Sequence, residues 1–519
     1  MNIVGLPNKN LAILGLSNSS VAFNLSTREL VCETLKRQEA QLSDLGALVV
    51  NTGKFKKRSP HNRFIVEDDA TKDINWGKEN QPISANSYNK VYSAVIEYLK
   101  DKKLYVKDAY ACSDSQYRLN LRMITETPSS ALFLNNMFLR YSSEELDNIT
   151  PDWTILCVPN FKIHQAIKGT YRENFVIINF SKQQILIGGT SYSGEIKKSI
   201  FSVLNLILPL NQEVLPLHCA ANVGVNGDTA LYFGLFGAHR TTLSINENRK
   251  LIGDDEHGWS DNGVFNFEGG CYPKGLSLRR EIKSEVYNPI QFGTILENIT
   301  FHPKTNKPNF EAASLARNAR ISFPLDHIEN TQPQLQGKHP KNIFFFTSDA
   351  HGVLPVVSKL TPEQAMYYFI SGYSSSYTRN DNGEQMPKTK FSACFGAPFL
   401  PLHPTKYAEM LKTKIIKHQT NVWLINTGWT GGAYGKGQAI PLKQVRAIIS
   451  AILNGDLDKV TFTQQPTFGL RIPTSCGTVP ISLLDPKKAW KDEAAYEKQA
   501  KKLTQAFQQN FQQYADIVS

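Results

Sequence analysis

Residues 229–241 read Thr-Ala-Leu-Tyr-Phe-Gly-Leu-Phe-Gly-Ala-His-Arg-Thr. The first five predict a strand, and the glycine that follows begins a turn into a helix. This order of strand, turn and helix is the setting of a phosphate-binding loop with the pattern G-x-x-x-x-G-K-[ST]. Gly234 and Thr241 fit the pattern, whereas His239 replaces its second glycine and Arg240 its lysine. The loop alone therefore favours an ordinary connection between a strand and a helix.

A pair of carboxylates strengthens the interpretation as a phosphate loop. Residues 251–259 read Leu-Ile-Gly-Asp-Asp-Glu-His-Gly-Trp, so an apolar run leads into Asp254 and Asp255. Carboxylates at such a strand end bind the metal ion of phosphoryl-transfer sites. Upstream lie two adjacent lysines and His218, which taken singly indicate a solvated helix and a buried structural histidine.

Composition bounds the class of protein. The chain has 519 residues, of which 41% are hydrophobic and 20% charged, enough for a large core and two domains. Extended disorder, collagen and coiled coils are excluded. The net charge of +11 favours anionic ligands and leaves an acidic protein or nucleic acid open as a partner. Lysines scattered over a solubilising surface explain the same charge.

The cysteines and apolar runs indicate where the protein works. Seven cysteines are widely spaced without a C-x-x-C pair, which is typical of a reducing compartment. No signal peptide is recognisable, and no apolar run reaches the length of a membrane span. We expect a cytoplasmic protein without membrane insertion; export by a route without such a signal is left open.

The order of elements predicts a mixed α/β fold. β-rich runs such as 62–66 and 175–179 alternate with helical stretches such as 87–100 and 194–208. A break near residue 210 predicts an N-terminal domain, 1–213, on the substrate side and a C-terminal domain, 214–519, with the loop and metal site. Polar residues 372–390 predict a mobile loop that acts as a lid. At the C-terminus one helical face carries Leu503, Phe507, Phe511 and Tyr514, which predicts core packing.

Further motifs complete a recognisable set. They are Asn51-Thr-Gly-Lys-Phe-Lys-Lys-Arg-Ser-Pro60, Gly188-Gly-Thr-Ser-Tyr-Ser-Gly-Glu-Ile-Lys-Lys198, Phe265-Asn-Phe-Glu-Gly-Gly-Cys-Tyr272, Phe391-Ser-Ala-Cys-Phe-Gly396 and Asn426-Thr-Gly-Trp429. With the loop and the carboxylates, this set resembles ATP-type phosphoenolpyruvate carboxykinase, in order from about residue 20 to the C-terminus. The resemblance implies a two-domain α/β fold with a P-loop-type C-terminal domain, and a monomer. It also implies the conversion of oxaloacetate and ATP to phosphoenolpyruvate, CO₂ and ADP, with Mn²⁺ at the site and Mg²⁺ on the nucleotide.

Site residues follow from the same resemblance. It places the Mn²⁺ ligands at Lys198, His218 and Asp255, the substrate-carboxylate contacts at Arg58, Tyr192 and Arg320, and catalytic side chains at Lys197, Lys198, Asp254, Arg58 and Arg320. Arginine suits carboxylates because its planar fork donates paired hydrogen bonds. A lysine ligates only as the neutral amine, so Lys198 would need a lowered pKa beside the metal and Lys197.

The nucleotide half departs from the family. Its loop residues are Gly234, Gly237, His239, Arg240, Thr241 and Thr242, with Phe236 and Ala238 where the family has a serine and a threonine. Beyond the glycine-rich segment, Ala439 replaces a nucleotide-contacting arginine and Val445 a threonine. Neither Phe236 nor Ala238 can donate a hydroxyl hydrogen bond to a phosphate. These departures make ATP doubtful as a ligand.

Three functions are compatible with this sequence. The first is a divergent enzyme that keeps a Mn²⁺ site for oxaloacetate, a similar β-keto acid or a phosphoenolpyruvate-like substrate, with impaired or altered phosphoryl transfer. The second is a pseudoenzyme that uses the inherited pocket or the basic surface for binding or regulation. The third is an ordinary ATP-dependent carboxykinase that tolerates a variant loop. The first is the favoured expectation.

Overall fold

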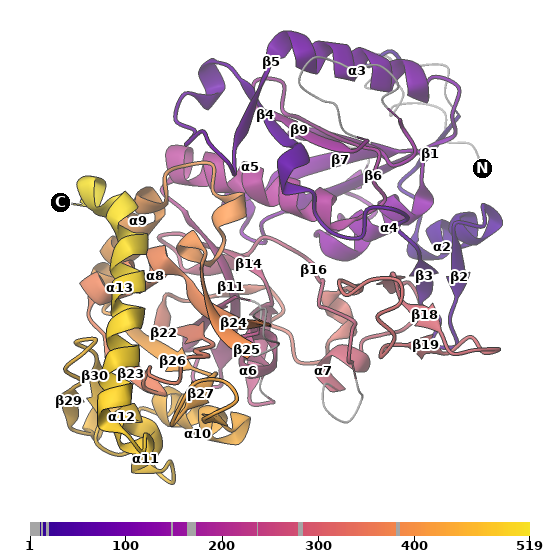
Figure 1. Cartoon of the computed structure of the whole chain (residues 1–519). Helices are drawn as coiled ribbons and strands as arrows, with labels where there is room; N and C mark the ends of the chain where they lie inside the picture. Colours follow the sequence, from indigo (N-terminus) through magenta and orange to yellow (C-terminus); the bar gives the residue numbers. More distant parts are fainter. Residues whose placement is uncertain are drawn as a thin grey trace. The chain divides into compact units, whose positions relative to one another are not determined.

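Figure 1 shows the computed structural model of the chain. It describes residues 11, 14–16, 20–146, 149–162, 173–235, 237–245, 247–278, 284–379 and 385–518. Two compact units are present: a first unit of Met1–Gln212, Phe265–Leu335 and Pro398–Leu402, and a second unit of Glu213–Val264, Gln336–Ala397 and His403–Ser519. The predicted domains, 1–213 and 214–519, are each continuous, whereas the chain returns to the first unit at Phe265 and again at Pro398.

The first unit is built on a mixed eight-stranded sheet, in which β6 and β7, and β9 and β10, run antiparallel and the other neighbours parallel. In spatial order its strands are β1 (Val21–Phe23), β6 (Leu104–Ala111), β7 (Leu119–Thr125), β8 (Trp153–Val158), β10 (Gln184–Gly188), β9 (Phe175–Asn179), β4 (Arg63–Glu67) and β5 (Gln81–Ser84). Helix α3 (Ala85–Leu99) covers one face, and α4 (Pro128–Met137) and α5 (Gly194–Gln212) cover the other (Figure 1). These layers confirm the predicted mixed α/β class.

Helical periodicity explains how α3 packs. Ser84 caps the helix by accepting the backbone N–H of Ser87. Tyr88, Val91 and Val95 then recur on one face, are fully buried, and pack against the sheet.

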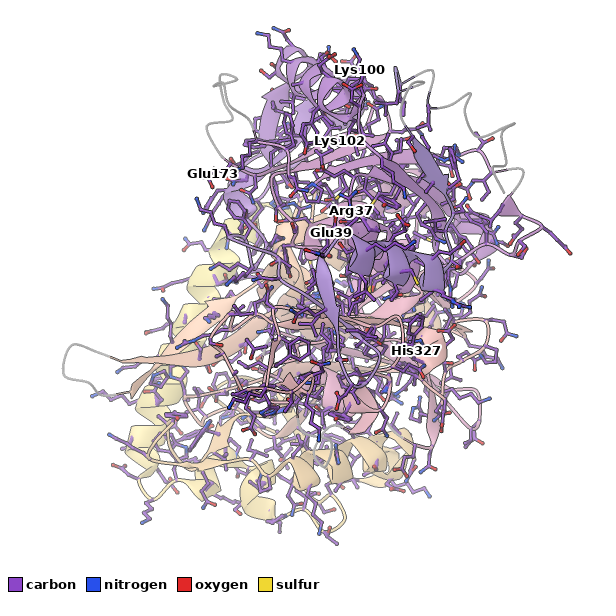
Figure 2. All side chains as sticks on the ribbon, turned by 90° about the vertical axis from the view of Figure 1, so that its right-hand side faces the viewer. Arg37, Glu39, Lys100, Lys102, Glu173 and His327 are labelled. Carbon is purple, nitrogen blue, oxygen red and sulfur yellow. The ribbon has the colours of Figure 1, made fainter. Side chains whose placement is uncertain are left out.

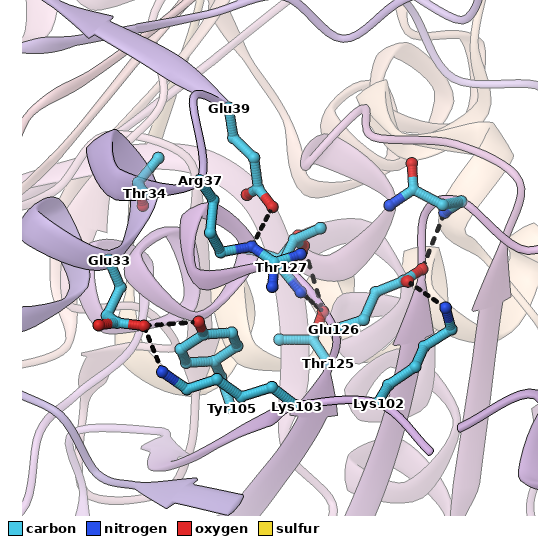
Figure 3. A network of polar contacts seen from close by, with 12 residues as sticks. Glu33, Thr34, Arg37, Glu39, Lys102, Lys103, Tyr105, Thr125, Glu126 and Thr127 are labelled. Atoms are coloured by element: carbon cyan, nitrogen blue, oxygen red, sulfur yellow. Dashed lines mark hydrogen bonds and ion pairs between the residues drawn. The ribbon is translucent and has the colours of Figure 1, made fainter. Parts of the chain in front are cut away.

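Charged side chains fix helix α2 (Thr27–Lys36) to the edge of this sheet. Glu33 accepts hydrogen bonds from Lys103 Nζ at 2.5 Å and from the Tyr105 hydroxyl at 2.8 Å (Figure 3). Arg37 Nε donates to Glu39 at 2.7 Å, and Figure 2 shows these two residues side by side on the surface of the first unit. The contacts of Glu33 join α2 to the start of β6, whereas the Arg37–Glu39 pair is local to the end of the helix.

A smaller five-stranded sheet of the first unit carries part of the candidate site. Its strands, in spatial order, are β16 (Gly270–Cys271), β20 (Arg320–Pro324), β17 (Ile295–Glu297), β3 (Leu48–Val50) and β2 (Ala40–Leu42). Strands β17 and β20 pair antiparallel, and their register sets Glu297 opposite Arg320.

The second unit contains a larger sheet whose central strands, β12, β22 and β26, are parallel. In spatial order its strands include β14 (Glu256–Trp259), β11 (Leu215–Gly224), β12 (Thr229–Gly234), β22 (Pro340–Thr347), β26 (Asn421–Asn426), β23 (Val357–Leu360), β30 (Arg471–Pro473) and β29 (Phe462–Gln464), with β13 (Arg249–Gly253) paired to β11. The predicted strand 229–233 is thus confirmed as a central strand.

Helices pack on both faces of this sheet. Ile448 and Ile452 of α10 (Leu442–Leu453) join one core cluster with Phe344 of β22. Phe369 of α8 (Pro362–Ser371) packs against Phe345, whose side chain points to the opposite face because neighbours alternate along a strand.

The C-terminal helix α13 (Glu493–Val518) confirms the predicted apolar stripe. Leu503 and Phe507 are both 2% exposed, and the Phe507 ring lies 5.4 Å from that of Tyr368 in α8. Helix α9 (Pro404–His418) packs beside α8. Among the described residues, no helix combines the length and hydrophobicity needed to cross a membrane.

The loop prediction for residues 372–390 is wrong for the residues that the structure describes there. Strands β24 (Tyr373–Arg379) and β25 (Gln385–Phe391) pair antiparallel, and residues 380–384 lie outside the described part. The polar side chains of this segment favoured a loop prediction, but within the hairpin they can form hydrogen bonds with backbone groups. Ser375, for example, donates its hydroxyl to the Ser348 carbonyl at 2.6 Å.

Candidate active site

The first unit gathers the three predicted carboxylate-binding residues around one shell of polar groups. Arg320 donates to the Asn318 side-chain oxygen at 3.3 Å and to the Tyr272 carbonyl at 3.1 Å. Asn318 also donates to the Tyr192 hydroxyl at 3.4 Å, and so it connects two of the predicted residues. Arg58 donates to the Pro398 carbonyl at 3.3 Å, and burial lowers the pKa of its guanidinium. The hydrogen-bond partners described for Arg58 and Arg320 are thus neutral oxygens.

A buried glutamate that the sequence analysis missed supports this shell. Glu297 is fully buried and accepts the backbone N–H of Ser193 at 3.2 Å, and it also accepts the Tyr272 hydroxyl in a short hydrogen bond. Burial raises the pKa of Glu297. Since Tyr192 precedes Ser193, and Arg320 donates to Tyr272, this carboxyl fixes the neighbours of both predicted contacts.

The two predicted lysines lie side by side on helix α5 but have different surroundings. Lys197 Nζ donates to Glu268 at 2.7 Å, and both side chains are buried. Lys198 Nζ lies 4.5 Å from the centre of the Phe399 ring, an arrangement in which the ring face attracts a cation. Glu268 stands in the quoted motif 265–272, although its role as the partner of Lys197 was not predicted.

The second unit places two of the predicted metal ligands, His218 and Asp255, together and adds Glu256 as a further candidate. His218 Nε2 of β11 lies 2.8 Å from Asp255 Oδ1, and Glu256 opposes His218 in the register of β11 and β14. One donor atom from each of His218, Asp255 and Glu256 lies within 4.8 Å of the others. Asp254 is buried next to them, at 7% exposed. Lys198 belongs to the first unit, so its assignment as a metal ligand stays a prediction.

Hydrogen bonding suits His218 to a metal ion. Its Nδ1 lies 2.8 Å from the Phe395 carbonyl oxygen, which can only accept, so Nδ1 carries the proton. In the neutral ring the lone pair is therefore on Nε2, the atom that a metal ion would bind; the 2.8 Å contact of Nε2 with Asp255 is an ion pair when the ring is protonated. Histidine ligands commonly hold this arrangement, with one nitrogen donating to a carbonyl and the other bound to the metal. The two carboxylates are donors that suit Mn²⁺, and the imidazole adds a nitrogen donor of the kind that binds first-row transition metals.

The loop after β12 turns into a short helix, as the sequence predicts, but the guanidinium of Arg240 contacts the carboxylate of Asp255. His239 adopts a left-handed conformation with φ of 57°, and Arg240 begins the short helix α6 (Arg240–Ser244). Arg240 Nη2 donates to Asp255 Oδ1 at 2.6 Å. Gly237 has φ of 94°, which favours glycine. Gly234 ends β12, whereas Phe236 and the side chain of Thr241 lie outside the described part.

The other positions that the resemblance places at the nucleotide differ in their exposure to solvent. Thr242 is half-buried in α6, and Ala238 is fully buried in the core of the second unit. Ala439 is exposed in the short strand β28 (Gln438–Ala439). Val445 of α10 is buried in the same core as Ala238. The side chain of Val445 is therefore a packing residue.

The features of the fold and the candidate site agree with the family to which the chain belongs. The described residues thus combine an α/β fold, a central strand that runs into a glycine-containing turn, and a histidine with two carboxylates that could hold a metal ion. A profile of the phosphoenolpyruvate carboxykinase family matches residues 19–482, and the chain belongs to this family.

Curated relatives extend over nearly the whole chain. The protein named phosphoenolpyruvate carboxykinase (ATP) of Flavobacterium johnsoniae is 49% identical over 98% of this chain and 96% of its own length. The protein of the same name from Christiangramia forsetii is 50% identical over 97% of this chain and 95% of its own. That from Amoebophilus asiaticus is 47% identical over 98% of each.

Proposed function

We propose that the chain is an ATP-dependent phosphoenolpyruvate carboxykinase, which converts oxaloacetate and ATP to phosphoenolpyruvate, ADP and CO₂. The observation that carries the proposal is the 49% identity, over nearly the full length, to a relative named for this activity. These relatives favour the ordinary enzyme over the divergent enzyme expected from the sequence. They give no support to a doubtful ATP site or to a pseudoenzyme.

In the proposed reaction, the first unit binds the substrate. Arg58 and Arg320 donate to the carboxylates of oxaloacetate, and Tyr192 fixes their orientation. The hydrogen bonds described for both arginines go to neutral oxygens, so a substrate carboxylate would not have to displace a bonded carboxylate. Loss of CO₂ places negative charge on the former keto oxygen, which then accepts the phosphoryl group of ATP.

The second unit supplies the remaining charge. His218, Asp255 and Glu256 would hold Mn²⁺, and Mg²⁺ would accompany ATP; these ions would supply the positive charge that stabilises the enolate and the phosphates. Backbone N–H groups of the loop 234–241 and the Arg240 guanidinium would face the phosphates. Lys197, which donates to Glu268, and Asp254 would be further catalytic side chains of this reaction, as the family resemblance implies.

Proton NMR tests this proposal directly. The protein is incubated with oxaloacetate and Mn²⁺, with and without Mg·ATP, and the spectra are corrected for spontaneous and metal-only decarboxylation. Vinyl protons of phosphoenolpyruvate that grow only with ATP are the expected result. If phosphoenolpyruvate does not rise above the protein-free control when ATP is present, the proposal is overturned, whether or not pyruvate forms.

A second candidate is Mn²⁺-dependent decarboxylation of oxaloacetate to pyruvate without ATP. The ion pair between Arg240 and Asp255 favours it, because a loop cation already paired with a carboxylate is less available to phosphates. This candidate predicts a pyruvate methyl signal without ATP. That signal would be lost in Asp255→Asn and kept in Arg240→Ala.

A further inference from the structure

The arginine that replaces the loop lysine competes for a metal-ligand atom. Arg240 Nη2 lies 2.6 Å from Asp255 Oδ1, and the same oxygen lies 2.8 Å from His218 Nε2. The Arg240 and Asp255 side chains are only 14% and 15% exposed, so solvent screens their attraction weakly. The second terminal nitrogen of Arg240, Nη1, is buried and has no hydrogen-bond partner among the described residues.

We infer that Arg240 is an internal cation that holds Asp255 when no divalent ion is bound, and that a divalent ion must displace its guanidinium. Metal binding then frees the Arg240 charge for the phosphates of a nucleotide. The order of events is metal first and phosphate contact second. The inference rests on the metal-ligand roles proposed for His218 and Asp255, and does not depend on which product the enzyme forms.

Packing of the loop limits how this exchange occurs. Ala238 and Leu243, on either side of Arg240, are buried in the core at 0% and 5% exposed, and this anchors the backbone. The Arg240 side chain has several rotatable bonds and ends in a guanidinium that reaches Asp255 through one nitrogen. A change of side-chain rotamer therefore separates the pair without moving α6. Lysine, a compact point charge without a planar fork, would leave Asp255 more readily.

Mn²⁺ titration followed by electron paramagnetic resonance tests the inference, since the signal of free Mn²⁺ reports binding without any turnover. We expect Arg240→Ala and Arg240→Gln to bind Mn²⁺ about tenfold or more tightly than the wild type, because the competitor is gone. Arg240→Lys should fall between them and the wild type. Equal or weaker binding in both Arg240→Ala and Arg240→Gln would overturn the inference.

Two controls separate the causes. Lys250→Ala removes an exposed positive charge from β13, the strand that leads to the carboxylates, and should leave Mn²⁺ affinity within about twofold of the wild type. Asp255→Asn should abolish binding with or without Arg240; if it does not, Asp255 is no ligand and the inference fails. Phosphoenolpyruvate formation in the NMR experiment, together with unchanged Mn²⁺ affinity in the Arg240 variants, would overturn the inference and leave the proposed function standing.

Discussion

The predicted substrate arginines of the first unit, Arg58 and Arg320, and the loop arginine of the second unit, Arg240, have different hydrogen-bond partners. Arg58 and Arg320 donate to backbone carbonyls and an amide oxygen, all neutral groups. Arg240 instead donates to a carboxylate at 2.6 Å. A cation held by neutral partners keeps its charge for a ligand, whereas a cation in an ion pair must first lose its partner. Under the proposed function, Arg58 and Arg320 would therefore bind substrate directly, whereas Arg240 would first have to exchange its partner.

The largest expected effect comes from the carboxylate that Arg240 and His218 share. Asp255→Asn should lower kcat about 1,000-fold or more, because the amide is a poor ligand for the divalent ion. Product formation at saturating substrate measures the loss. Asp261→Asn, an exposed carboxylate paired with Lys417 at 3.1 Å, is the matched control and should stay within about twofold. Activity above one tenth of wild type in Asp255→Asn would remove Asp255 from the metal site.

The second largest effect is expected from the arginines that are proposed to bind the substrate carboxylates. Arg320→Ala should raise the KM for oxaloacetate about 100-fold, since the loss of one charged hydrogen-bonding partner costs about 2–3 kcal/mol. The KM for ATP should change much less. Arg317→Ala, three residues earlier and exposed, serves as the control. If both variants raise KM equally, the effect is one of net charge and Arg320 makes no specific contact.

A smaller effect is expected from pH. Burial and the nearby positive charge of Arg320 together lower the pKa of Lys274, which forms a backbone bridge with Arg320, to about 8. Below pH 8 the ammonium adds positive charge near Arg320, and above pH 8 that charge is lost. Binding of oxalate, followed by calorimetry, should weaken by up to about tenfold between pH 7 and pH 9. Lys274→Arg keeps its charge and should make the profile flat over this range, and an unchanged slope would contradict this role.

The smallest effect concerns the loop backbone. His239 is left-handed with φ of 57°, a conformation that glycine adopts without strain. His239→Gly should lower the KM for ATP about threefold, because the β-carbon no longer crowds the turn, and should change stability by less than about 1 kcal/mol. Gln419→Gly, at a left-handed helix end with φ of 51°, is the matched control. A rise in the ATP KM would show that the histidine contributes to binding.

Local patterns in the sequence account for what could be predicted. Strand β12, the helical stripe of Leu503 and Phe507, and the adjacency of Asp255 to the loop all follow from periodicity or short spacing. The hairpin of β24 and β25 was missed because its many serines and lysines are typical of a loop. In the structure the Ser375 hydroxyl instead donates to a backbone carbonyl. Glu297 was missed because its partners, Ser193 and Tyr272, are distant in sequence and no local pattern marks a single buried carboxyl. The Arg240–Asp255 pair was missed because the sequence does not show which way an arginine turns.

The register between β17 and β20 makes the orientation of Glu297 depend on the number of residues in its strand. Glu297 faces Arg320 across β17 and β20, and neighbouring side chains of a strand point to opposite faces. Inserting or deleting one residue within Ile295–Glu297 would turn the carboxyl away from Tyr272 and Ser193. Homologous chains that keep this pocket should therefore vary the sequence of this segment but hold its length constant.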